Sequence, residues 1–257
     1  MCNIFKWFRK KEEPNMARLD EKYWNDKWPK APIIYAGRAL RGKSDRIGID
    51  VKKFILDNDE IMKQVIKKYR LDRGSPDQIA EQVQRFVVRS FTYKYDDETA
   101  NIPEFWQFPF ESLQSGIGDC EDGAILISSL LINSGIPSFR VKVAAGYVQA
   151  SPTAPQGGHA YCIYLADDNK WRILDWCYYE DSSIPINKKP LASEGGQRKA
   201  YKDIWFTFND QYSWNQSKIE IKDGRISNHQ TKDLNESIET SQVTIDSILN
   251  NIDKRMK

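Results

Sequence analysis

The chain has 257 residues, of which 40% are hydrophobic, 29% charged and 12% aromatic. This composition is typical of a folded globular protein and excludes a disordered chain. The formal net charge of +2 points to no class of partner, and no apolar run is long enough for a transmembrane helix. The N-terminal apolar patch is short and its basic residues follow it, unlike a signal peptide. We therefore expect a cytoplasmic protein with no membrane span, whose four cysteines stay reduced.

Residues 1–45 are expected to form a basic N-terminal extension. Residues 1–43 hold eleven Lys and Arg against five Asp and Glu, and tryptophans and prolines are scattered among them. Such an arm is more often a solvated tail than a nucleic-acid or membrane ligand, and we expect no specific nucleic-acid partner. We favour an arm that wraps the domain, while docking of a partner or a second copy through its aromatic residues stays open.

Helical spacing is found over residues 51–71 and again after Ser75-Pro76. The serine is a favourable N-cap, and proline suits the first helical position. Apolar residues then recur at helical spacing from Ile79 to Val87, which predicts an amphipathic helix. A short extended piece is expected at 91–95, followed by an irregular, aromatic-rich segment at 101–115.

The next segment, Gly116 to Gly123, predicts a tight turn that leads into a helix over 120–133, with Cys120 at its start. Apolar side chains lie nearly all round this helix, so we expect it to be buried on most sides. The helix dipole and the unpaired N–H groups of the first turn would stabilise a thiolate there. The alternative is a small buried cysteine with no chemical role.

Downstream, alternation predicts a strand over 139–143, and small and breaker residues predict a loop over 150–158. A β-hairpin is expected from His159 to about residue 178, and another aromatic-rich strand within 201–214. The last region, 216–257, should hold a hairpin around Asp223-Gly224 and a helical tail from about Leu234. That tail could dock on the domain or on another chain.

His159 is one of two histidines and follows a Gly-Gly loop, and Asp175 lies on the next predicted strand. Side chains alternate along a strand, so a four-residue hairpin loop at 167–170 would place the two residues on opposite faces. A loop at 167–169 or 166–170 would place them on the same face, within hydrogen-bonding reach. A Cys–His–Asp relay therefore requires an odd loop or a bulge.

In such a relay, Cys120 attacks a carbonyl, His159 moves the proton, and Asp175 orients the imidazole. The oxyanion would be bound by the N–H of Cys120 and by the Trp106-Gln107 region. A metal site built from Cys162, Cys177 and His159 would compete with this arrangement. No ligand pair has zinc spacing, so we expect no metal there and two core thiols. His229 is expected to be solvated.

Three motifs resemble one known family. They are WQFPFESL over 106–113 with GDCED over 118–122, HAY from His159, and ILD ending at Asp175. Together they are similar to the transglutaminase-like superfamily, closest to its bacterial cysteine peptidases, over roughly residues 75–180. The resemblance implies an α+β, papain-like core in which a cysteine-bearing helix packs on an antiparallel sheet. It also implies that residues 46–215 form a transglutaminase-like catalytic domain, in which Cys120, His159 and Asp175 take the triad positions.

The expected function is a cysteine peptidase or amidase that hydrolyses an amide bond of a protein or peptide. Two alternatives stay open: a transglutaminase that transfers the acyl group to an amine, and a non-catalytic structural or binding protein of a phage particle. Similarity to phage-encoded members would place the protein in the host cytoplasm or the virion. No cofactor is required. Calcium held by Asp119 and Glu121 is a further implication of the resemblance, although we favour a helix-capping role for both.

Overall fold

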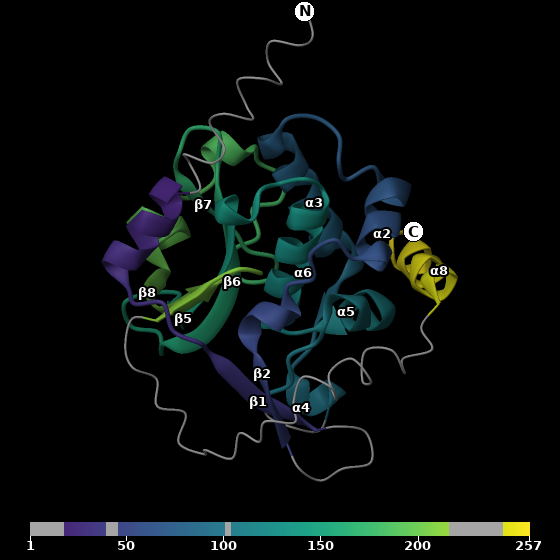
Figure 1. The fold of residues 1–257 in the computed structure, drawn as a ribbon, viewed down its shortest axis with the longest axis horizontal. Helices are drawn as coiled ribbons and strands as arrows, with labels where there is room; N and C mark the ends of the chain where they lie inside the picture. Colours follow the sequence, from purple (N-terminus) through teal and green to yellow (C-terminus); the bar gives the residue numbers. More distant parts are fainter. Residues whose placement is uncertain (1–17, 40–45, 101–103, 216–243) are drawn as a thin grey trace, which may run out of the picture.

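The computed structural model describes residues 18–39, 46–100, 104–215 and 244–257. Its centre is a five-stranded antiparallel sheet of order β7-β6-β5-β8-β9 (Figure 1). These strands are β5 (Val141–Val148), β6 (Gly157–Leu165), β7 (Trp171–Leu174), β8 (Tyr201–Phe208) and β9 (Ser213–Asn215). Two small sheets flank it: the antiparallel pair β1 (Ile34–Ala39) and β2 (Arg46–Asp50), and the parallel pair β3 (Thr92–Tyr93) and β4 (Ile117–Gly118). The predicted α+β class is confirmed.

Helix α6 (Cys120–Asn133) lies between the sheet and the other helices (Figure 1). It contacts β5 and β6 on one side and α2, α3 and α5 on the others. The surrounding helices are α2 (Glu60–Tyr69), α3 (Pro76–Ser90), α4 (Asp96–Thr99), α5 (Pro109–Ser115) and α8 (Ile245–Arg255). Because apolar residues occupy nearly every face of α6, burial on all sides removes most of its surface from water, as the sequence predicted.

Local signals explain where the helices begin and end. Ser75 Oγ accepts the N–H of Gln78, and the side chain of Gln78 accepts the N–H of Ser75, so a capping box starts α3. Gly116, with φ of +68°, ends α5 in the left-handed conformation that glycine adopts without strain. These caps set the path of the chain into Cys120.

The helix expected over residues 51–71 is interrupted. Residues Val51–Phe54 form one 3₁₀ turn, and α2 starts only at Glu60. Asp59 caps α2 by accepting the N–H of Met62, and Asn58 before it has φ of +50°. The polar run at 57–59 therefore supplies a turn and a new N-cap, which competes with a continuous helix.

The face of the sheet away from α6 is covered by the N-terminal segment. Residues 18–27 are helical, and Trp24 and Trp28 pack with Trp214 of β9 in a second apolar cluster. The buried amine of Lys142 on β5 pairs with Asp20 at 2.7 Å. Residues 18–28 therefore lie on the domain, and the β1–β2 pairing spans the predicted boundary at residue 45. That boundary and the one at 215 remain predictions.

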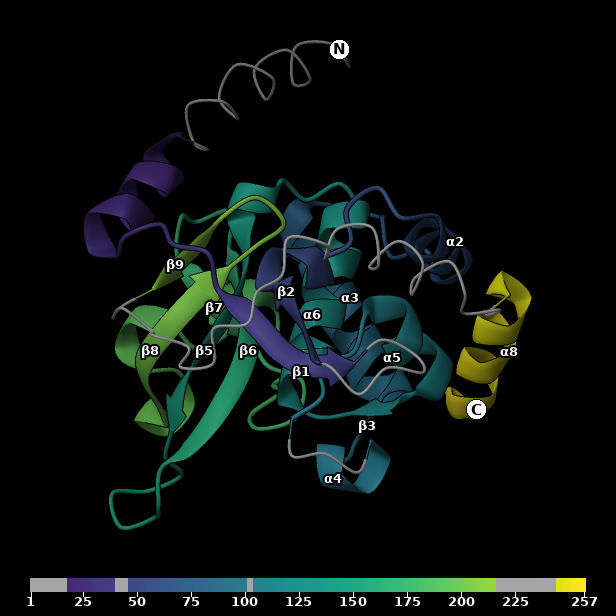
Figure 2. The ribbon, with the colours of Figure 1, turned by 60° about the horizontal axis from the view of Figure 1, so that its bottom comes forward.

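Helix α8 packs against α5, α2 and α3, on the opposite side of the molecule from residues 18–27 (Figure 2). Ile248 and Ile252 are fully buried, and Arg255 donates to the carbonyl of Leu113. The predicted helical tail is thus present over 245–255 and docks on its own domain. The hairpin expected around Asp223-Gly224 lies outside the described residues. No helix within the described ranges is long and apolar enough to cross a membrane.

Candidate active site

Cys120 is the first residue of α6, as predicted. Its half-buried thiol donates to Glu121 Oε2 at 3.4 Å, and its sulfur accepts the N–H of Ala160, also at 3.4 Å. The indole of Trp176 donates to the carbonyl of Cys120 at 3.2 Å. The first residue of the buried helix is therefore tied to β6 and to the segment that follows β7.

The electrostatic expectation for Cys120 is corrected by the structure. Burial, together with the nearby carboxylate of Asp119, raises the pKa of the Cys120 thiol well above its usual range. The helix dipole by itself favours the thiolate. Desolvation and a like charge oppose the dipole, so the thiol is protonated in this arrangement and depends on a base for ionisation.

His159 and Asp175 meet because the hairpin loop has an odd length. Leu165 pairs with Trp171, so the loop is 166–170, one of the two lengths that the relay requires. Asp175 then follows β7 on the same face as His159. His159 Nε2 lies 2.6 Å from Asp175 Oδ2, and both side chains are buried. The predicted histidine–aspartate contact is confirmed.

Asp175 is held by more groups than the sequence indicated. Oδ2 also accepts the hydroxyl of Tyr201 at 2.6 Å, and Oδ1 accepts the N–H groups of Cys177 and Tyr178 at 3.1 and 3.3 Å. Burial acts to raise the pKa of Asp175, but His159 and these donors outweigh it and hold the pKa below its ordinary value. The aspartate is therefore a carboxylate near neutral pH.

The rings of three tyrosines surround the imidazole of His159, with centroids at 5.3 to 6.2 Å: Tyr161, Tyr178 and Tyr201. Sequence reasoning missed all three. Tyr161 could have been found from its position two residues after His159 on the same strand face. Tyr201 comes from a strand that is not adjacent to either residue in the chain, so no local signal marks it.

No hydrogen bond joins the side chains of Cys120 and His159 within the described part of the chain. His159 shares its strand face with Tyr161 and Ile163, whose side chains belong to the cluster away from α6, whereas Cys162 belongs to the core around α6. The sulfur instead contacts the backbone of Ala160, the next residue after His159. The structure thus brings His159 and Asp175 together and places the Cys120 thiol against the backbone of the residue that follows His159.

Trp106 and Gln107 lie near the start of α6, but their donors are occupied. The side-chain amide of Gln107 donates to Asp122 Oδ2 at 2.7 Å and to the carbonyl of Ile117 at 3.0 Å. Its backbone N–H donates to Asp122 Oδ1, and the indole N–H of Trp106 donates to Glu104. An oxyanion-binding role for Trp106 and Gln107 would require these bonds to change, and it stays a prediction.

Four carboxylates gather beside the thiol: Asp96, Asp119, Glu121 and Asp122. One oxygen of each lies within 4.8 Å of one from every other member. Burial raises the pKa of Asp96 to about 7 and raises the pKa values of Glu121 and Asp122 well above the usual range. Three of their buried oxygens have no hydrogen-bond partner within the described ranges: Asp96 Oδ1, Asp119 Oδ1 and Glu121 Oε1. Helix capping, the role favoured from the sequence for Asp119 and Glu121, therefore does not account for all of these carboxylate oxygens.

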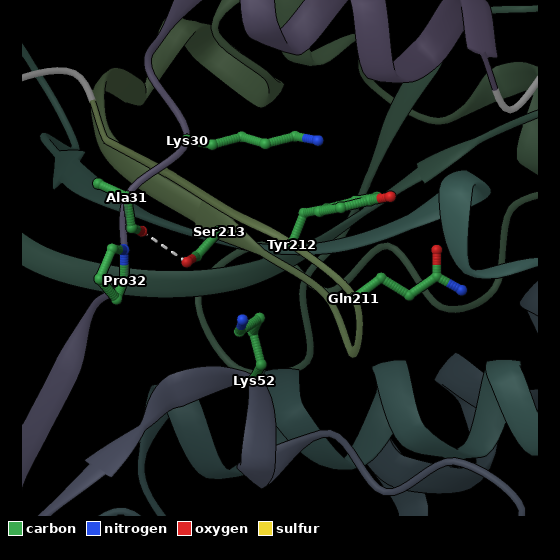
Figure 3. Close-up of a pocket in the computed structure, with 7 residues that line it drawn as sticks. All are labelled: Lys30, Ala31, Pro32, Lys52, Gln211, Tyr212 and Ser213. Carbon is green, nitrogen blue, oxygen red and sulfur yellow. Dashed lines mark hydrogen bonds between the residues drawn. The ribbon is translucent and has the colours of Figure 1, made fainter.

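The remaining thiols differ from each other. Cys162 is fully buried in the core, as expected, whereas Cys177 is half-buried and lies 3.7 Å from Asp175 Oδ1. A separate cavity of about 200 Å³, with Lys30, Lys52 and Tyr212 in its wall, lies between β9 and the 3₁₀ turn at 51–54 (Figure 3). None of the candidate site residues lines it, so the cavity has no part in the site described above.

Part of the chain matches a known protein family. Residues 63–176 match the model of the transglutaminase-like superfamily. The chain is therefore similar to that superfamily over these residues, which make up less than half of its length. The match includes the proposed nucleophile, histidine and aspartate in one segment. No curated protein matches the chain.

Among solved structures, LapG of Legionella pneumophila is similar at 22% identity and a TM-score of 0.44, over 61% of this chain and 86% of that one. EGTA-treated LapG is similar at 20% identity and a TM-score of 0.45, over 75% and 96%. Calcium-bound LapG is similar at 19% identity and a TM-score of 0.39, over 68% and 98%.

Proposed function

We propose that this protein is a thiol-dependent acyl-transfer enzyme, a cysteine peptidase or amidase that hydrolyses an amide bond of a protein or peptide. The observation that carries the proposal is the buried His159–Asp175 pair at 2.6 Å, next to a cysteine at the start of the central helix. A histidine oriented by a carboxylate beside a thiol is the arrangement that nucleophilic catalysis requires.

The hydrogen bond between His159 and Asp175 supports a different role for each ring nitrogen of the histidine. Since Asp175 is ionised, it accepts the proton of His159 Nε2, which leaves Nδ1 as the basic nitrogen. Nδ1 takes the proton of Cys120 when the thiol turns from Glu121 toward it, and the resulting thiolate attacks the amide carbonyl. The protonated Nδ1 then protonates the leaving amine, and water releases the acyl group from sulfur through the same base.

The tetrahedral intermediate carries a negative charge that needs donors. The N–H of Cys120 belongs to the first turn of α6, whose N–H groups have no partner within the helix. We include it as one oxyanion donor. This assignment follows the predicted role, whereas Trp106 and Gln107 would first have to give up their present partners.

The four carboxylates beside the thiol fit a calcium ion. Calcium prefers several oxygen ligands, and three buried oxygens here lack hydrogen-bond partners within the described ranges. Asp96, Asp119, Glu121 and Asp122 would hold the ion. When bound, it would neutralise the carboxylates around Cys120 and fix the turn before α6, while the proton transfers remain with His159.

Thiol labelling tests the role of Cys120. Iodoacetamide at neutral pH should modify Cys120 faster than Cys162, which is fully buried. Cys120→Ser should abolish both the fast labelling and the hydrolysis of a fluorescent casein substrate, while Cys162→Ser serves as the matched control. Equally slow labelling of all thiols, with no turnover, would instead support a non-catalytic binding protein.

The same acyl-enzyme could react with an amine in place of water. Incorporation of dansylcadaverine into casein therefore distinguishes transamidation from hydrolysis. We expect released peptides and little incorporation. Dominant incorporation would assign the chain as a transglutaminase and would overturn hydrolysis as its main reaction.

A further inference from the structure

Asp175 is surrounded by donors from three separate parts of the chain. His159 on β6 and Tyr201 on β8 both reach Oδ2 at 2.6 Å, while two backbone N–H groups after β7 reach Oδ1. The carbonyl of Asp175 also accepts the side-chain amide of Gln84 on α3 at 2.6 Å. The backbone donors and Gln84 hold Asp175 in position, and the two donors on Oδ2 determine how its charge is shared between His159 and Tyr201.

Tyr201 is held in place from outside the site. Its backbone N–H donates to the carbonyl of Gly195 at 2.9 Å, and its ring packs against Gly196. A Cβ on Gly196 would lie 2.3 Å from Cδ2 of this ring, and Gly196 has φ of +67°. Only glycine combines that backbone conformation with so close an approach. The loop before β8 therefore fixes the position of the Tyr201 hydroxyl relative to the Asp175 carboxylate.

The Tyr201 hydroxyl can only donate here. Burial and the adjacent carboxylate raise the pKa of Tyr201 far above its usual range, so the hydroxyl keeps its proton and does not act as a base. A donor on Oδ2 draws negative charge away from the oxygen that faces His159 Nε2. The carboxylate therefore stabilises a protonated imidazole less strongly when the donor is present than when it is absent.

We propose that Tyr201 is a positioning residue, whose buried hydroxyl orients Asp175 toward His159 and limits how basic His159 becomes. The catalytic consequence rests on the proposed role of His159 as the base, whereas the effect on His159 itself does not. The other titratable groups that face His159 are Tyr161 and Tyr178, with Cys177 on Asp175 and the Cys120 thiol beyond Ala160. Tyr201 differs from the other two tyrosines because its hydroxyl bonds the carboxylate.

The experiment is an NMR titration of the two histidine side chains in full-length protein, with His159→Gln used to assign the signal. Tyr201→Phe keeps the ring and removes one hydroxyl. We expect the pKa of His159 to rise by about 0.5 to 1 unit, a three- to ten-fold increase in proton affinity. Tyr161→Phe is the matched control, because this ring is equally buried and its hydroxyl makes no bond to Asp175. It should leave the pKa of His159 unchanged.

An unchanged or lowered His159 pKa in Tyr201→Phe would overturn the proposal, as would an equal rise in Tyr161→Phe. Gly196→Ala displaces the Tyr201 ring but retains its hydroxyl, so it should also raise the pKa of His159. This variant tests the proposal if Tyr201→Phe does not fold. In an active preparation of Tyr201→Phe, the apparent pKa of the acidic limb of the kcat/KM–pH profile should rise by the same amount. If no preparation turns over, the proposed function fails while the titration still decides the role of Tyr201.

Discussion

Replacing Asp175 with asparagine isolates the part of the site that carries the proposed chemistry. Oδ1 faces two backbone N–H groups, from Cys177 and Tyr178. The asparagine must therefore place its carbonyl oxygen there, since its amino group would face two donors. Its amino group then occupies the Oδ2 position, facing His159 Nε2 and Tyr201. Because that group donates, Nε2 has to accept, and the imidazole proton moves to Nδ1.

The two consequences of Asp175→Asn differ greatly in size. Stability should fall by at most about 2 kcal/mol, because two charge-assisted bonds become neutral ones of roughly half the strength while a buried charge is removed. Hydrolysis should fall by about 10⁴-fold, equivalent to about 5 kcal/mol in the barrier, because a proton on Nδ1 leaves that nitrogen unable to accept the proton of the Cys120 thiol in the proposed mechanism. A large loss of rate thus accompanies a nearly unchanged fold.

The assay combines kcat/KM on a peptide amide, thermal unfolding, and ¹⁵N NMR of the His159 tautomer. Asp168→Asn is the matched control: this exposed carboxylate lies on the same hairpin, and within the described residues its partners are the N–H of Lys170 and the guanidinium of Arg172. Activity should stay within about two-fold. Activity of Asp175→Asn within ten-fold of that of the native protein would refute the proposed role of the carboxylate. That role is equally refuted if activity falls while the proton stays on Nε2.

Three further predictions concern the buried charges. Lys142→Met should destabilise the fold by about 3 to 5 kcal/mol in urea unfolding, because it leaves the buried Asp20 carboxylate without its ion-pair partner. Adding Asp20→Asn should recover most of this loss. A loss below about 1 kcal/mol in Lys142→Met would contradict the prediction. Burial lowers the pKa of Lys142 to about 8, against about 10.4 unfolded. The unfolded chain therefore holds more protons between these values, and native stability should rise from pH 8 to 10 relative to Lys142→Met; parallel stability curves would exclude it. Millimolar Ca²⁺, but not Mg²⁺, should raise the melting temperature, and Asp119→Asn with Glu121→Gln should remove that response; an equal response in both proteins would rule out the proposed site.

Features that depend on neighbours in the chain were predictable. The start of α3 at the Ser75 cap and the start of α6 at Cys120 follow from capping, proline placement and helical periodicity. The contact between His159 and Asp175 required only the parity of a hairpin, since a single choice of loop length decides which faces meet. The interruption at 57–59 was missed because a polar turn and a helical stretch compete there at similar strength.

By itself, the sequence determined that one cysteine starts a buried helix and that a histidine and an aspartate lie on the two strands of one hairpin. The odd loop length that puts the two side chains on one face was decided by the structure. Only the tertiary structure brought Tyr201 to Asp175, set Asp96 among the carboxylates of the cysteine motif, and placed the half-buried thiol beside them. The reason is physical. Caps and periodicity act over a few residues, whereas desolvation and hydrogen bonds between distant strands exist only after the chain has packed.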